Sequence, residues 1–79
     1  MKVIVAKVDE NLFDGEADSL TAPGSAGELT ILHGHMPLMT TLKEGSIIIR
    51  AKSFPQGAQE IPISGGIMEV RHDGATVIL

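Results

Sequence analysis

The apolar residues of this 79-residue chain come in short runs that are separated by glycine, proline and Asp-Gly pairs. No segment keeps apolar residues at positions i, i+3, i+4 and i+7 over the ten or so residues that an amphipathic helix needs. The segment Ser46–Lys52 instead alternates, so that Ile47, Ile49 and Ala51 share one side of a strand. Short runs of this kind predict an all-β domain, with about eight strands arranged as a two-sheet sandwich or a flattened barrel.

Turns are expected where glycine follows a polar residue or another glycine. Asp14-Gly15, Ser64-Gly65-Gly66 and Asp73-Gly74 each predict a tight hairpin turn, and Pro23-Gly24 is expected to end the strand before it. Pro62 cannot donate a hydrogen bond to a neighbouring strand. Its strand is therefore expected to lie at a sheet edge or to contain a bulge.

The expected core takes apolar side chains from nearly every strand. A domain of this length buries only about 60–65% of its unfolded surface, so the core has to draw on residues along the whole chain. The predicted core residues are Val3, Val5, Leu12, Phe13, Leu20, Leu29, Ile31, Leu42, Ile47, Ile49, Ile61, Ile63, Ile67, Val70, Val77 and Leu79.

Composition excludes several classes of function. The chain has no cysteine, so it forms no disulfide and no thiolate metal site. Its six basic residues are scattered among ten acidic ones, and it has neither Tyr nor Trp, whereas nucleic-acid binding favours a basic stripe with aromatic platforms. The longest apolar run, Val3–Ala6, is far shorter than the roughly 20 residues that cross a bilayer. We expect one soluble domain over residues 1–79 that binds no nucleic acid.

His33 and His35 are the strongest candidates for metal chemistry. On a strand, side chains two residues apart face the same side, so both imidazoles could reach one ion. A stable site needs three or four ligands, and the nearest others are Glu28 and His72. We therefore expect no metal site, and we expect His35 to order its own loop by hydrogen bonding to the backbone.

Residues for catalysis are not found in a recognisable pattern. No serine lies in a Gly-x-Ser-x-Gly context, and the glycine-rich residues 24–27 lack the lysine and the helix of a phosphate-binding loop. The acidic residues between Asp9 and Asp18 match no EF-hand spacing and are expected to form a solvated rim. We expect no catalytic and no cofactor-binding residues.

The most distinctive stretch is Pro23–Thr40, which reads PGSAGELTILHGHMPLMT. It resembles the signature of the epsilon subunit of F-type ATP synthases, called delta in mitochondria. Leu42–Gly45, Ile63–Val70 and Thr76–Leu79 resemble further motifs of that family in the same order. The resemblance extends from about Val3 to Leu79.

The resemblance implies a fold and a role. The fold would be two packed five-stranded antiparallel sheets, hence about ten short strands. The role would be that of a non-catalytic rotor subunit, which links gamma to the c-ring and couples proton flow to ATP synthesis. The protein would sit peripherally at the cytoplasmic face of the bacterial inner membrane, reaching the membrane only through the complex. Family members commonly continue into a C-terminal helical hairpin, for which these 79 residues contain no segment.

The resemblance also implies contact residues. In the family, the glutamate that matches Glu28 lies where the sandwich meets the polar loops of the c-ring, so Glu28 is the expected c-ring contact. The loop that matches residues 33–40 docks on gamma. His35, Met36 and Met39 are therefore the expected gamma contacts.

The residues by themselves leave two other functions open. The first is a free-standing β-sandwich module that presents the 33–40 loop to an unrelated peptide or protein, with Leu38 facing inward and Met36 and Met39 available to the partner. The second is a metal-dependent enzyme that uses His33 and His35.

Overall fold

The computed structural model describes all 79 residues, and it contains nine strands and no helix. It therefore has no helix with the length and apolar character needed to span a membrane. The strands are β1 (Lys2–Lys7), β2 (Glu10–Glu16), β3 (Ser19–Gly24), β4 (Gly27–Leu32), β5 (Leu38–Leu42), β6 (Gly45–Arg50), β7 (Ala58–Ile63), β8 (Gly66–Arg71) and β9 (Gly74–Ile78).

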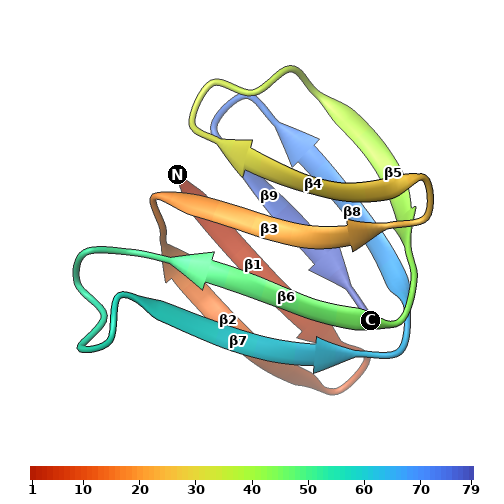
Figure 1. Ribbon diagram of the computed structural model, residues 1–79, viewed down its shortest axis with the longest axis horizontal. Coiled ribbons are helices and arrows are strands. Elements are labelled where there is room, and N and C mark those ends of the chain that lie inside the picture. Colours follow the sequence, from red (N-terminus) through yellow and green to blue (C-terminus); the bar gives the residue numbers. More distant parts are fainter.

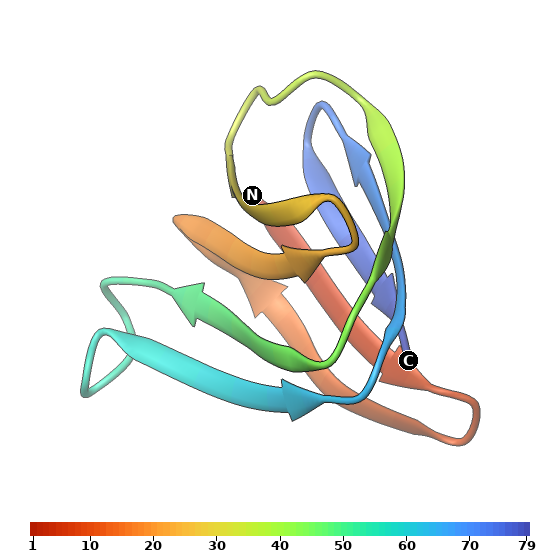
Figure 2. The ribbon, with the colours of Figure 1, turned by 45° about the vertical axis from the view of Figure 1, so that its right-hand side comes forward.

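The strands form a single sheet that folds back on itself in the order β2-β1-β9-β8-β5-β3-β6-β7, with β4 paired to β3. The sheet continues from β5 to β3 through one residue pair, Gly24 with Leu42. One layer holds β2, β1, β9, β8 and β5, and the other holds β4, β3, β6 and β7 (Figures 1 and 2). The predicted β-sandwich is confirmed, with nine strands where about ten were expected.

One strand pair is parallel, so the expectation that both sheets are antiparallel throughout was wrong at this pair. β1 runs alongside β9, from Lys2 opposite Gly74 to Ala6 opposite Ile78. A Cβ atom at Gly74 would overlap the carbonyl oxygen of Lys2. The close approach of these two strands therefore depends on glycine at position 74.

Most of the predicted core is buried, and Ile67 is the clear exception. Its side chain is 48% exposed, whereas its neighbour Met68 is completely buried. Side chains alternate along a strand, so Met68 and Val70 can face the core together, but Ile67 and Val70 cannot. Four other predicted core residues are only partly buried and pack against the core: Leu12, Phe13, Leu29 and Leu79. The buried apolar residues that are absent from the predicted core are Ala17, Ala22, Ala51, Met68 and Ala75.

Two of the expected turns are extended strand instead. Asp14-Gly15 lies inside β2, and the chain turns earlier, at Val8-Asp9. Pro23-Gly24 continues β3, and the turn follows at Ser25-Ala26. Gly27, the first residue after this turn, has a φ of 138°. Glycine can adopt this backbone conformation because it has no side chain, whereas other residues rarely do.

The connection Ser64-Gly65 is not a hairpin turn. It leads from β7, which pairs only with β6, to β8 in the opposite layer, so it carries the chain between layers. The turn predicted at Asp73-Gly74 does join paired strands, β8 and β9. Pro62 lies on β7, an edge strand, as predicted.

A pair of aromatic rings lies where the sheet does not close. Phe13 of β2 and Phe54 of the loop after β6 pack edge to face, with ring centroids 5.8 Å apart and planes at 86°. Aromatic rings favour this geometry because the positive edge of one ring meets the negative face of the other. The contact connects the two layers on the side where β2 and β7 are not hydrogen bonded to each other.

Candidate docking surface

The loop between β4 and β5 covers residues 33–37 and is ordered by its own histidine. His35 Nδ1 donates a hydrogen bond to the carbonyl oxygen of Met36 (2.7 Å), and the His35 backbone N–H donates to the carbonyl of Leu32 (3.1 Å). Gly34 has a φ of 83°, which a side chain would disfavour. The prediction that His35 orders the loop through backbone hydrogen bonds is confirmed.

The same loop is fastened to the turn between β8 and β9. The Gly34 N–H donates a hydrogen bond to the carbonyl oxygen of His72 (3.1 Å). The ring centroids of His33 and His72 are 6.1 Å apart, and the angle between the ring planes is 62°. His33 therefore neighbours His72, which lies far away in sequence. No three His, Cys, Asp or Glu residues lie close enough together to hold a metal ion, so the geometry adds no support for the metal-dependent alternative.

Two methionines project from this end of the molecule. Met36 in the loop is 78% exposed and Met39 is 68% exposed. The expected loop was too long at its C-terminal end, because Met39 belongs to β5. Leu38 and Leu42 face the core from β5, so Met39 between them faces outward; Leu38 is half-buried against the core, as predicted. The exposed area is apolar and adaptable, as unbranched Met side chains are.

Glu28 lies at the opposite end of β4 from this loop. It is the second residue of the strand, opposite Pro23, and it is exposed without an ion pair to any other residue. Leu32 is four residues further along the strand, which corresponds to about 14 Å at 3.4 Å per residue. The structure thus places His35 and Met36 together, Met39 on the next strand, and Glu28 apart from them.

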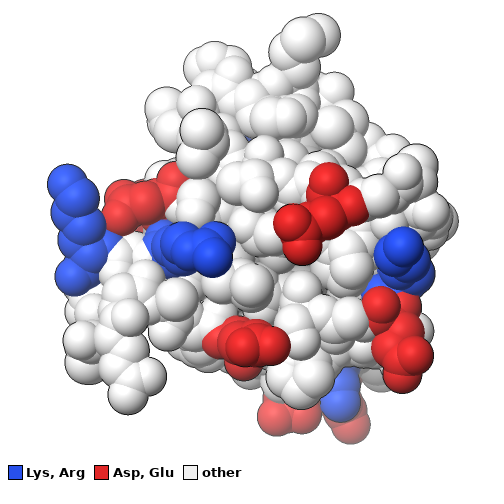
Figure 3. All heavy atoms as spheres, in the orientation of Figure 1, with Lys and Arg blue, Asp and Glu red and all other residues white.

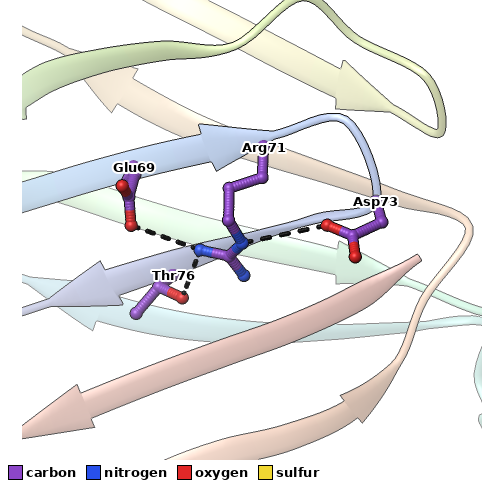
Figure 4. Close-up of polar contacts among 4 residues, drawn as sticks. All are labelled: Glu69, Arg71, Asp73 and Thr76. Carbon is purple, nitrogen blue, oxygen red and sulfur yellow. Dashed lines mark hydrogen bonds and ion pairs between the residues drawn. The ribbon is translucent and has the colours of Figure 1, made fainter.

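Charged groups border Met39 on the outer side of its layer. Met39 is opposite Glu69 in the β5–β8 ladder. Arg71 Nη1 lies 3.3 Å from Glu69 Oε1 and donates to Thr76 Oγ1 at 3.0 Å, while its Nε lies 3.8 Å from Asp73 Oδ1 (Figure 4). This Arg71 cluster holds the Glu69 carboxylate beside the exposed methionine.

The charge pattern differs between the two ends of the molecule. The β4–β5 loop has no Lys, Arg, Asp or Glu, and the surface at the top of Figure 3 is correspondingly free of charged side chains. Elsewhere on the outer face of the first layer, the carboxylate of Asp14 lies 2.8 Å from Lys2 Nζ. Its hydrogen bond and its negative charge raise the pKa of Lys2. A surface with an uncharged centre and charged residues around it is typical of a contact with another protein, and the β4–β5 loop forms such a centre.

The largest cavity, about 350 Å³, does not resemble an active site. It lies between the β1–β2 turn and the β7–β8 connection and includes Lys7, Asp9 and Ser64 in its lining. No hydrogen bond or ion pair joins these three side chains. A nucleophile and a base within hydrogen-bonding distance, the usual arrangement for covalent catalysis, are therefore not found there.

Sequence reasoning did not name Leu32 as part of this surface, although it is 58% exposed. The signal was available, because Leu29 and Ile31 were assigned to the inner face and Leu32 must then face outward. Leu32 immediately precedes the β4–β5 loop and extends the apolar character of this end of the molecule.

Comparisons with known proteins agree on one family. The family described as ATP synthase delta/epsilon chain, beta-sandwich domain, matches residues 1–79. The ATP synthase epsilon chain of Herminiimonas arsenicoxydans is 42% identical over 79 residues, which are 99% of this chain and 55% of that protein. The epsilon chain of Laribacter hongkongensis is 41% identical over 80 residues, with the same coverage. This chain spans about half the length of these relatives.

Solved structures share the fold. A chain from the central stalk and c-ring structure of Tetrahymena thermophila mitochondrial ATP synthase superposes with a TM-score of 0.82 at 17% identity, over 98% of this chain and 60% of that one. A chain from the Euglena gracilis mitochondrial ATP synthase structure gives 0.84 at 22% identity, over 96% and 48%. At such identities the likeness establishes the fold alone.

Proposed function

Because this chain belongs to the ATP synthase delta/epsilon chain family, we propose that it is a non-catalytic part of the central stalk of an F-type ATP synthase. In this role it links a gamma-type subunit to the c-ring and turns with the rotor, so that proton flow is coupled to ATP synthesis. The fold suits this task, because a close-packed core deforms little under load.

The observation that carries the proposal is the separation of two different contact points along β4. The uncharged end has two methionines that are each more than two-thirds exposed, Met36 and Met39. The other end has the unpaired carboxylate of Glu28. An apolar contact that adapts to a partner would bind gamma, together with His35, and a charged contact would reach the polar loops of the c-ring. A single small partner would not need both the apolar contact and the charged contact, because they lie at opposite ends of β4.

The proposed location follows from these partners. A domain held between gamma and the c-ring touches the membrane only through the complex, at the cytoplasmic face of a bacterial inner membrane. A chain of the same fold in a solved central stalk and c-ring supports the position between gamma and the c-ring, and the bacterial epsilon chains that this chain resembles support a bacterial membrane. Fractionation of cells that carry the tagged protein would test it: the protein is expected in the membrane fraction and should be released together with the other extrinsic subunits.

Size-exclusion chromatography with a purified gamma-type subunit tests the proposal directly. The two proteins are expected to elute together, and a Met36→Asp variant is expected to elute separately from gamma. Separate elution of the unmodified proteins, over a range of concentrations that includes tens of micromolar, would contradict the proposal. That result would favour a free-standing module that uses the same loop on another partner.

A further inference from the structure

Three strands, β2, β4 and β7, are hydrogen bonded along one side only. Unpaired strand edges can recruit an additional strand, and proteins usually protect them with charges, proline or bulges. β2 has a shift in its register opposite Val5 and Ala6 and contains the acidic residues Glu10, Asp14 and Glu16. β7 contains Glu60 and Pro62. Both of these edges are protected.

The edge of β4 has none of these protections except one charge. Its six residues pair with β3 without any shift, from Gly27 opposite Gly24 to Leu32 opposite Ser19. It contains no proline, and Glu28 is its one charged residue. Thr30, in the middle of the strand, is exposed and belongs to a residue type that favours strands. A regular, exposed and nearly uncharged edge is suited to receive another strand.

The backbone groups of β4 that face the open edge can be identified from two hydrogen bonds. In an antiparallel pair, opposite residues alternate between exchanging hydrogen bonds and pointing away from each other. The carbonyl oxygen of Pro23 accepts from Lys43 N–H, so Pro23 points away from its partner Glu28. By the same alternation, Glu28, Thr30 and Leu32 direct their N–H and C=O groups to the open edge, where the Leu32 carbonyl already accepts from His35 N–H.

We propose that β4 binds an extended segment of the gamma-type subunit as an added strand, a contact that rests on the function proposed above. The open N–H groups of Glu28, Thr30 and Leu32 and the carbonyls of Glu28 and Thr30 supply the backbone hydrogen bonds. The outward side chains set the register: the added strand places an apolar residue beside exposed Leu32 and a small polar residue beside Glu28, whose carboxylate stays free for the c-ring. This is strand addition, in which the backbone provides affinity and alternate side chains provide specificity.

A second copy of this chain is a poorer occupant of the edge. Antiparallel pairing of two β4 edges centred on Thr30 would place Glu28 of one copy against Leu32 of the other. A carboxylate would then lose part of its hydration against an apolar side chain, without a partner of opposite charge. A different chain can instead match both ends of the strand.

Amide hydrogen exchange, followed by NMR on the 15N-labelled 79-residue chain, tests the proposal with and without unlabelled gamma-type subunit. In the free chain, the amides of Leu29 and Ile31 are expected to exchange slowly and those of Glu28, Thr30 and Leu32 quickly. Binding of gamma should slow the second group by about 10-fold or more. A complex in which these three amides still exchange quickly would overturn strand addition but not the proposed function. Absence of any complex would overturn both, and protection that depends on the concentration of the free chain would point to self-pairing instead.

A matched pair of variants tests the backbone contribution. Thr30→Pro removes an N–H that faces the open edge and leaves the ladder with β3 intact, since edge strands tolerate proline there. Thr30→Val keeps that N–H and removes the hydroxyl, which bonds to Thr21 Oγ1 at 3.0 Å. Gamma binding should weaken about 10-fold or more in the proline variant and by less than about 2-fold in the valine variant. Equal binding by a folded proline variant would refute the proposal, and if that variant does not fold, the exchange pattern of the unmodified chain decides.

Discussion

Replacing Met39 tests whether the outward side of β5 contacts gamma, and the choice of replacement matters. Aspartate at this position would stand directly opposite Glu69 in the β5–β8 ladder. Like charges in opposite positions destabilise a strand pair by up to about 1 kcal/mol. Threonine at position 39 also removes the apolar side chain, but it favours strands and adds no charge. Comparing Met39→Asp with Met39→Thr therefore separates a loss of binding from a loss of stability.

The size of the binding effect follows from the exposure of Met39. Full burial of a methionine side chain stabilises by about 1.5–3 kcal/mol. Since 68% of Met39 is exposed in the free chain, a partner that covers it completely gains about two-thirds of that, or about 1–2 kcal/mol. Met39→Thr, which retains one methyl group, should then weaken gamma binding about 5- to 30-fold. Met39→Asp should weaken it further, because a carboxylate would be placed in an apolar contact.

Isothermal titration calorimetry with the gamma-type subunit gives the affinity, and urea unfolding followed by circular dichroism gives the stability. Circular dichroism is the appropriate probe because the chain has no Trp or Tyr. Met39→Thr is expected to unfold within about 0.5 kcal/mol of the unmodified chain, as surface substitutions usually do. Affinities unchanged in both variants would refute the contact. A large loss of stability in Met39→Thr would show instead that Met39 belongs to the core.

Two further predictions concern the other contact and the core. Glu28→Lys should impair coupling to the c-ring with little change in stability, since Glu28 is exposed and has no ion-pair partner in the chain; unchanged proton pumping in reconstituted vesicles would contradict this. Met68→Ala should lower the free energy of unfolding by about 2–5 kcal/mol, and Ile67→Ala by about 1 kcal/mol or less, because only Met68 is fully buried. Urea unfolding compares the two, and a larger loss in Ile67→Ala would mean that the register of β8 is different.

Local patterns predicted the fold class and most inward positions. Alternation in Ser46–Lys52 placed Ile47 and Ile49 correctly, because the period of a strand is set by its own backbone. The same rule, applied to β8, would have excluded Ile67, and the error came from choosing residues by hydrophobicity without enforcing the period. The rule that a glycine after a polar residue marks a turn was wrong at Asp14-Gly15, where the segment continues as a strand paired to β1.

Contacts between distant parts of the chain were beyond local reasoning. Nothing in Ser64-Gly65-Gly66 distinguishes a hairpin from a passage between layers, since the two differ only in where the following strand finds its partners. The proximity of His33 and His72 depends on the β8–β9 turn meeting the β4–β5 loop. The exposure of Met36 was expected from its loop, whereas the open edge of β4 became visible only from the sheet order.

The parallel pairing of β1 with β9 has a mechanical consequence. Lys2 is opposite Gly74 at one end of the pair, and Ala6 is opposite Ile78 at the other. A tension applied between residues 1 and 79 would therefore pull the two strands in opposite directions along their length. All hydrogen bonds between β1 and β9 would then bear the load at once. This geometry does not allow the strands to peel apart, a process in which the hydrogen bonds would break one after another. A domain that has to stay intact while being twisted would gain from such a clamp.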